Sequence, residues 1–303
     1  AVCFVSFLFL HESCKLGTIP SNLTMRLLIT LLLFTFAQQS FAQAVMLDTA
    51  KSNYIRVGDV KIHYKVWGKG EPIVLLHGAM EYWKEWKNQI PELAKKYRVI
   101  AVDTRGHGES SFTDVPLSYD MFAEDIIAVM NKTQIDSANV IGYGDGGIIA
   151  MKIAMKYPLR VRKVIAIGSN CRPDSTAVYP EIIQKVKAWD IDKMAFYLQM
   201  KFKENPNPKL LNAFAKRMQT LLLTEPNLSA DDLDAIKCPV LFMVGDHDLI
   251  KISHTEFMYE NVPNGFLSVI SGATHYCIKE KPAVVNAVIR DFIQWPATKL
   301  KRF

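Results

Sequence analysis

Gly142-Tyr143-Gly144-Asp145-Gly146-Gly147 is the stretch that decides the fold of this 303-residue chain. The apolar run Asn139-Val140-Ile141 precedes it and favours a strand, whereas residues 148–157 favour a helix.

The turn also matches G-x-G-x-x-G, in which glycines let a pyrophosphate approach a helix N-terminus. A dinucleotide-binding turn normally opens its domain and has an acidic residue about 20 positions further on. Here the turn lies near mid-chain, and the predicted strand over residues 161–167 ends in Gly168-Ser169-Asn170, so the flanks disfavour a nucleotide site.

Four further segments combine a short apolar run with a turn rich in polar residues and glycine. Short apolar runs that alternate with helix-length stretches predict a mostly parallel sheet with helices on both faces. The carboxyl ends of such strands face one crevice, so these turns are expected to meet there. The four are residues 73–76 before His77-Gly78-Ala79, residues 99–102 before Asp103 to Ser110, residues 240–244 before Gly245-Asp246-His247-Asp248, and residues 266–270 before Ser271 to His275.

With these turns in this order, the chain from about residue 54 to residue 295 resembles the α/β-hydrolase superfamily. The resemblance rests on the combination of H-G, D-x-R-G-H-G-x-S, a strand-to-helix elbow, G-x-x-D and G-x-x-H. The elbow is most similar to the G-x-S-D-G-G form of valacyclovir-hydrolase-like and enol-lactonase-like members, with Gly144 where the nucleophilic Ser is expected. The resemblance implies a mostly parallel central sheet flanked by helices, with a helical cap inserted after the sixth strand.

The resemblance also implies catalytic roles. Gly144 occupies the nucleophile position, His275 matches the general base, and Asp248 matches the acid that orients the base. Asp246 is the nearby alternative acid, but Asp248 matches the second Asp of the family's G-x-x-D turn.

An oxyanion hole would be formed by the backbone N–H groups of Asp145 and Ala79. His77 and the loop over residues 103–110 are expected to shape turns rather than to do chemistry. No metal or organic cofactor is implied, and the expected partner is a small-molecule substrate or ligand.

Gly144 removes the hydroxyl that acyl transfer on this fold requires. The predicted function is therefore that of an ester or acyl hydrolase acting on a small carboxylic ester, lactone or amide. With glycine at position 144, this hydrolase is expected to be impaired or inactive. His275 and Asp248 could instead activate water directly, or the crevice could bind a small molecule without chemistry. A further reading takes Gly144 as a replacement for a Ser of the working protein. A last alternative makes Asp145 the nucleophile, as in epoxide hydrolases and dehalogenases, although those relatives place Asp in the slot that Gly144 fills here.

The N-terminal region reads as an export signal. Met25-Arg26 gives a positive start, residues 27–37 are apolar, and Ser40-Phe41-Ala42 offers a cleavage site. The apolar run of about 11 residues is shorter than the roughly 20 that span a bilayer, so no stable membrane anchor is expected after cleavage. We expect residues 1–24 to be a non-native or untranslated leader, residues 25–42 a signal peptide, and the mature protein to be periplasmic or secreted.

The remaining chain is predicted to form one α/β-hydrolase core, over residues 43–172 and 239–303, with a helical cap over residues 173–238. The net charge of +6 is modest and scattered, which disfavours a nucleic-acid surface. Five cysteines include Cys171, Cys238 and Cys277 after the signal peptide, with no predicted pairing. Large apolar residues of the cap are expected to form its core or its underside: Trp189, Met194, Phe196, Tyr197, Met200, Phe202, Phe214 and Met218.

Overall fold

A computed structural model of the chain describes residues 30, 46–47 and 49–296. The predicted leader lies outside these residues, as does the predicted signal peptide apart from Thr30. Within the described residues, no helix has both the length and the apolar character needed to cross a membrane. The chain from Thr49 onward forms a unit of its own.

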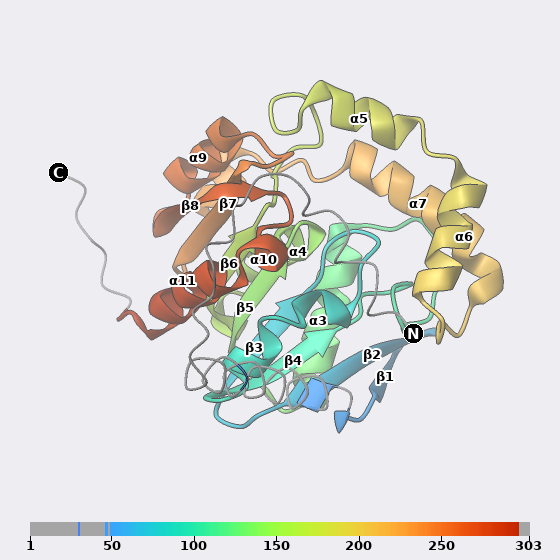
Figure 1. The fold of residues 1–303 in the computed structure, drawn as a ribbon, viewed down its shortest axis with the longest axis horizontal. Coiled ribbons are helices and arrows are strands. Elements are labelled where there is room, and N and C mark those ends of the chain that lie inside the picture. The colour runs from blue at the N-terminus through green and yellow to red at the C-terminus, as the bar shows by residue number, and fades with distance from the viewer. Residues whose placement is uncertain (1–29, 31–45, 48, 297–303) are drawn as a thin grey trace. The chain divides into compact units, whose positions relative to one another are not determined.

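An eight-stranded sheet runs through the described part of this unit, in the order β1-β2-β4-β3-β5-β6-β7-β8 (Figure 1). β2 pairs antiparallel with β1 and β4, and every neighbouring pair from β4 to β8 is parallel, which confirms the predicted mostly parallel sheet. The strands are β1 Asn53–Val57, β2 Val60–Trp67, β3 Glu71–Leu76, β4 Tyr97–Val102, β5 Ala138–Tyr143, β6 Val161–Ile167, β7 Val240–His247 and β8 Gly265–Thr274.

The central strands are buried because helices flank the sheet. Residues 73–76 of β3 and 99–102 of β4 are fully buried. Both faces of such strands are apolar, which is why they read as continuous Val, Ile and Leu runs rather than as alternating patterns. Leu76 of β3 pairs with Gly142 of β5, so the turns after these two strands lie side by side.

Helices connect the strands in the expected alternation. α4 packs on β5 and β6 and against α3, whereas α9 packs on β7 and β8. α3 begins after Ser118, whose hydroxyl accepts a hydrogen bond from the N–H of Met121. The core helices are α2 Ile90–Leu93, α3 Tyr119–Lys132, α4 Asp145–Lys156, α9 Ile252–Asn261, α10 Cys277–Glu280 and α11 Pro282–Gln294, with short 3-10 turns at η1 Trp83–Trp86 and η2 Pro158–Arg160.

A group of helices separates β6 from β7, as the resemblance implies for a cap. α5, α6 and α7 lie together in the upper right of Figure 1, and α7 packs against both α5 and α6. α8 begins with a capping box in which Ser229 and Asp232 bond each other's backbone N–H groups. The elements are α5 Pro180–Lys187, α6 Ile191–Lys201, η3 Pro208–Leu210, α7 Leu211–Thr224 and α8 Ala230–Asp234.

The cap is fastened to the loop over residues 103–110. Asn205 is buried, and its amide donates hydrogen bonds to the carbonyls of Gly106 and Gly108 at 3.2 and 2.9 Å. Phe214 of α7 packs so closely on Gly106 that a Cβ there would lie 2.3 Å from the ring. Glycine is therefore required at position 106 for the cap to seat on this loop.

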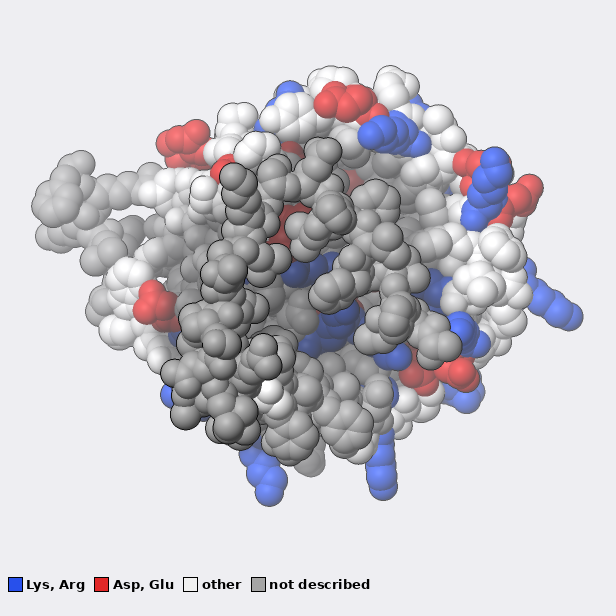
Figure 2. All heavy atoms as spheres, viewed as in Figure 1, with Lys and Arg blue, Asp and Glu red and all other residues white. Residues whose placement is uncertain are grey.

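The prediction that the large apolar residues of the cap form its core or its underside is only partly right. Phe202, Phe214 and Met218 are buried, but Phe196 and Met200 are 65% and 57% exposed, on the outer side of α6. The reason is that Leu198 is the buried residue of α6, so the face opposite to it stays in solvent. On the described part of the face in Figure 2, basic and acidic side chains are interspersed, in keeping with the scattered charge.

Candidate active site

Gly144 lies at the turn between β5 and α4 and is the residue that precedes the first turn of α4. Its φ of +53° is in the left-handed region, which glycine adopts without the cost that a Cβ imposes. Gly146 is required for a different reason, since a Cβ there would lie 2.0 Å from the carbonyl oxygen of Leu76. The turn thus brings α4 against β3 and leaves position 144 at the crevice.

The structure brings His275 and Asp248 together beside this turn. His275 Nδ1 lies 2.7 Å from Asp248 Oδ1, and the Asp248 side chain is fully buried. The N–H of Ile250 donates to the same carboxylate oxygen at 3.0 Å. A Cβ built on Gly144 would lie 3.9 Å from His275 Nε2. With Nδ1 donating to Asp248, Nε2 is the nitrogen left to accept a proton at position 144.

Asp246, the alternative acid, is engaged elsewhere. Its carboxylate accepts hydrogen bonds from the N–H groups of Gly272 and Ala273 at 2.8 and 3.0 Å, and it pairs with His247. These bonds lower the pKa of Asp246 and hold the end of β8. The structure therefore orients His275 with Asp248 rather than with Asp246.

The His77-Gly78-Ala79-Met80 loop is held by a continuous chain of hydrogen bonds. The N–H of Met80 donates to His107 Nε2 at 3.3 Å, and His107 Nδ1 lies 2.9 Å from Thr104 Oγ1. Thr104 bonds His77 Nε2 through its N–H at 3.0 Å and its hydroxyl at 3.2 Å, and His77 Nδ1 lies 2.8 Å from the carbonyl oxygen of Gly78. We name this chain the His77–Thr104–His107 relay.

The bonding pattern of the relay fixes the protons on both rings. A carbonyl only accepts, so His77 carries its proton on Nδ1, and a backbone N–H only donates, so His107 Nε2 is unprotonated. Burial lowers the pKa of His77 and lowers that of His107 further, so both rings stay neutral at ordinary pH. The loop that the relay holds includes Met80, a non-glycine residue with φ of +57°.

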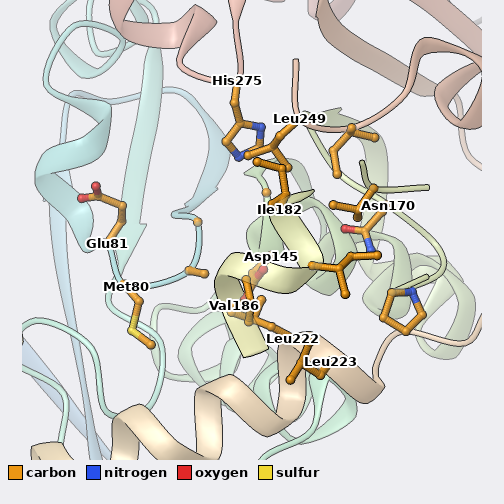
Figure 3. Close-up of a pocket in the computed structure, with 18 of the residues that line it drawn as sticks. Met80, Glu81, Asp145, Asn170, Ile182, Val186, Leu222, Leu223, Leu249 and His275 are labelled. Carbon is orange, nitrogen blue, oxygen red and sulfur yellow. The ribbon is translucent and has the colours of Figure 1, made fainter. Parts of the chain in front are cut away.

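A cavity of about 320 Å³ opens beside Gly144, Ala79 and His275, between the sheet and the cap (Figure 3). Its cap side is mainly aliphatic, with Ile182 and Val186 from α5 and Leu222 and Leu223 from α7. Trp189, Met194 and Tyr197, three of the cap residues singled out in the sequence, also line it. Such a cavity suits a small, largely apolar molecule with one reacting polar group.

Asp145, the first residue of α4, brings a buried carboxyl group to this cavity. Burial raises its pKa to about 7, against the opposing influence of the Tyr119 hydroxyl and of His275. Among the described residues, neither Asp145 Oδ2 nor the Tyr119 hydroxyl has a partner in hydrogen-bond geometry. Tyr119 and Glu225 complete this corner of the cavity, and the sequence carried no signal for either, because both are remote from the elbow along the chain.

A cluster of four charges at the cavity edge was also absent from the sequence-based prediction. Glu81 lines the cavity and lies 2.7 Å from Lys201 of α6 and 3.5 Å from Lys279 of α10. Lys279 lies 2.6 Å from Glu85, which is buried. Burial and the charge of Glu81 raise the pKa of Glu85 to about 7. These pairs join the cap to the core beside the cavity.

Three cysteines lie in the part of the chain that the structure describes, and none of the three lines the cavity. Cys171, Cys238 and Cys277 are free thiols, and burial raises the pKa of each to about 12. Cys171 Sγ lies 3.4 Å from His254 Nε2, but such a thiol stays protonated and is a poor nucleophile.

Comparisons with known proteins agree with this fold. Residues 71–210 match the family model of the alpha/beta hydrolase fold. Epoxide hydrolase 4 of Homo sapiens is 26% identical over 286 residues, covering 80% of this chain and 78% of the relative. Serine hydrolase BPHL of Mus musculus is 28% identical over 250 residues, covering 79% and 85%.

Solved structures give the same picture. Est816, described as an N-acyl homoserine lactone degrading enzyme, has a TM-score of 0.67 at 25% identity, covering 79% of this chain and 100% of that one. The enol-lactonase from Burkholderia xenovorans LB400 shares the fold, with a TM-score of 0.66 at 20% identity and coverage of 80% and 100%. With this sheet, this cap and these matches, the chain has the α/β-hydrolase fold.

Proposed function

We propose that this protein binds a small carboxylic ester, lactone or amide with its carbonyl group beside Gly144, and that it hydrolyses this substrate only weakly as written. The observation that carries the proposal is the His275–Asp248 pair, 2.7 Å apart. His275 Nε2 lies 3.9 Å from the Cβ position of residue 144, and both residues line a cavity of about 320 Å³. A general base held by a buried carboxylate is suited to remove a proton from an attacking oxygen.

In this proposal, the attacking oxygen belongs to water because Gly144 offers none. His275 Nε2 accepts a proton from the water as it attacks the carbonyl carbon, and Asp248 stabilises the resulting imidazolium. His275 then returns the proton to the leaving group. Sites that lose a member of the triad retain roughly 10³–10⁴-fold acceleration over water through binding and the oxyanion hole.

The oxyanion would be held by the N–H groups of Ala79 and Asp145. Asp145 opens α4, and the first N–H groups of a helix have no partner within the helix. The relay bonds the carbonyl of Gly78, and the C=O and N–H of a trans peptide point in opposite directions. The N–H of Ala79 is therefore directed away from His77, and Ala79 lines the cavity.

The experiment below also distinguishes two alternative functions. A binding protein without turnover is favoured by Gly144 itself, since the apolar cavity persists without a nucleophile. Asp145 as nucleophile is disfavoured by its pKa of about 7, which leaves much of the carboxyl protonated at neutral pH.

The experiment compares hydrolysis of p-nitrophenyl acetate and butyrate by the protein and by Gly144→Ser, each with and without His275→Ala. The proposal expects Gly144→Ser to gain turnover that His275→Ala abolishes, together with covalent labelling by a serine-directed phosphonate. An active parent that Asp145→Asn inactivates would instead assign the reaction to Asp145. Absence of turnover in both the parent and Gly144→Ser, with a ligand tightly retained, would favour the binding protein.

We also propose that the protein is exported, on the strength of the signal-like sequence over residues 25–42. N-terminal sequencing of natively expressed protein should then find a mature start near Gln43. A start before Met25 would contradict this proposal.

A further inference from the structure

The two outer helices of the cap, α5 and α6, have few fixed contacts. α5 has no buried residue and α6 has one, Leu198, whereas α7 has five. Their side-chain and carbonyl hydrogen bonds to the rest of the cap go to α7, where Gln219 donates to the carbonyl of Val186 at 2.7 Å and Asn212 donates to Asp192. Segments with so little buried surface open at a lower free-energy cost than a packed core does.

One ion pair connects this outer part of the cap to the core. Lys201, the last residue of α6, lies 2.7 Å from Glu81, and the two side chains are only 17% and 19% exposed. Within the described part of the chain, no other hydrogen bond or ion pair joins residues 180–201 to the core. Lys201 Nζ also lies 3.0 Å from the hydroxyl of Tyr197, which lines the cavity. The place of α6 beside the cavity is therefore linked to the place of Glu81.

Glu81 belongs to the turn that would hold the oxyanion. Its N–H donates to the carbonyl of Gly78 at 3.2 Å, and this is the carbonyl that His77 Nδ1 also bonds. Ala79, the proposed oxyanion donor, lies inside this turn, and residues 78–81 all line the cavity (Figure 3). A displacement of Glu81 would consequently reorient the peptide groups of the turn, including the one that carries the Ala79 N–H.

We propose that Lys201 is a positioning residue, which pairs with Glu81 as the cap closes over a substrate and thereby sets the Ala79 N–H in place for the oxyanion. The inference rests on the proposed function, because an oxyanion forms only if the site attacks a carbonyl group. Closure of the cap and completion of the oxyanion hole are then one event. Lys201 touches no reacting atom and acts through Glu81.

A second partner of Glu81 makes the role of Lys201 testable. Lys279 of α10 lies 3.5 Å from Glu81 and 2.6 Å from Glu85. Glu81 keeps this cationic partner when Lys201 is replaced, so Lys201→Met removes the link to the cap without leaving a lone, poorly solvated charge. Lys201→Arg retains a positive charge on a long side chain and serves as the conservative variant.

The first measurement is amide hydrogen exchange in α6 of the full-length protein and of Lys201→Met. Loss of the ion pair should speed exchange over residues 191–201 by about 2- to 5-fold. Arg217→Met is the matched control, because it breaks another pair between cap and core, in which Arg217 lies 3.0 Å from Asp114. The control should leave exchange in α6 unchanged. Equal exchange in the parent and in Lys201→Met would overturn the inference.

The second measurement is hydrolysis of p-nitrophenyl butyrate in the Gly144→Ser background. Lys201→Met should lower kcat about 10-fold with little change in KM, because an oxyanion donor acts mainly in the transition state. Lys201→Arg should restore most of kcat, and Arg217→Met should leave it unchanged. A loss confined to KM, or an equal loss in Arg217→Met, would contradict the positioning role.

The same assay separates this inference from the proposed function. Full kcat in Gly144→Ser with Lys201→Met would reject the role of Lys201 and leave the proposed function standing. An inactive Gly144→Ser would reject the proposed function and this inference with it.

Discussion

Placing any side chain at position 144 should cost stability, and the size of the cost follows from the backbone. Gly144 has φ of +53° and ψ of −118°. Holding a non-glycine residue in such a sparsely populated region costs about 1–3 kcal/mol. Clashes add little, because the nearest atoms to a Cβ lie at 3.5 and 3.9 Å. We therefore expect Gly144→Ala and Gly144→Ser to lower the free energy of unfolding by similar amounts.

The assay is thermal unfolding of the parent and both variants under one condition. For a folded unit of roughly 250 residues, each kcal/mol lowers Tm by about 2–4 °C, so both variants should melt about 2–12 °C below the parent. The two variants differ by a hydroxyl, which makes Gly144→Ala the matched control for strain without chemistry.

Activity should separate the two variants. Loss of a triad serine costs up to about 10⁶-fold in well-adapted enzymes, so even an imperfect site should gain about 10²-fold or more in kcat/KM with Gly144→Ser and nothing with Gly144→Ala. Variants as stable as the parent would refute the strained turn. A destabilised but inactive Gly144→Ser would refute the placement of His275 as its base.

Three further outcomes follow from buried groups. In the Gly144→Ser background, His107→Leu removes the acceptor of the Met80 N–H and should lower kcat about 10-fold or more with little change in KM. His107→Gln keeps an acceptor for this N–H and should retain most of the activity. Equal losses of kcat in the two variants would refute the role of the His77–Thr104–His107 relay in holding the loop. The Asp145 carboxyl has a pKa raised from 3.8 to about 7, so the folded state binds the extra proton and stability falls as pH rises from about 4 to about 7. Urea unfolding should accordingly show the stability advantage of Asp145→Asn over the parent growing across that window, and a pH-independent difference would contradict it. Lys163 Nζ donates to the carbonyls of Phe292, Ile293 and Trp295 at the end of α11, so Lys163→Met should lower the free energy of unfolding by about 2–4 kcal/mol. The control Lys152→Met breaks an exposed pair with Asp120 and should lower it by less than about 1 kcal/mol. Equal losses of stability in denaturant titration would refute the role of Lys163.

The fold was predictable because its signals are local. Each central strand is a short apolar run, and each site turn follows its strand directly, as Gly144 follows β5 and Asp248 follows β7. Since the carboxyl ends of parallel strands meet at one edge, the turns that carry Asp248 and His275 were expected to lie close together. The family resemblance then selected Asp248, rather than Asp246, as the partner of His275.

The surroundings of the site were not predictable in the same way, because they depend on long-range packing. Glu81 pairs with Lys201 only once the cap has folded over the core. Tyr119 lies near Asp145 only because α3 packs on α4. Phe196 shows the opposite error. Its apolar character suggested a buried place, but which face of α6 is covered depends on how α7 packs against it.

The groups around position 144 hold their places by contacts that do not involve that residue's side chain. Asp248 is fixed by backbone N–H groups, His275 by Asp248, and the Ala79 loop by the relay. Loss of a serine hydroxyl from this arrangement would thus require no compensating change, and its return would require one substitution. For that reason Gly144 governs which oxygen nucleophile the base can use, rather than whether the crevice exists. Water and a serine at position 144 are then alternative nucleophiles for a single base on an otherwise unchanged scaffold.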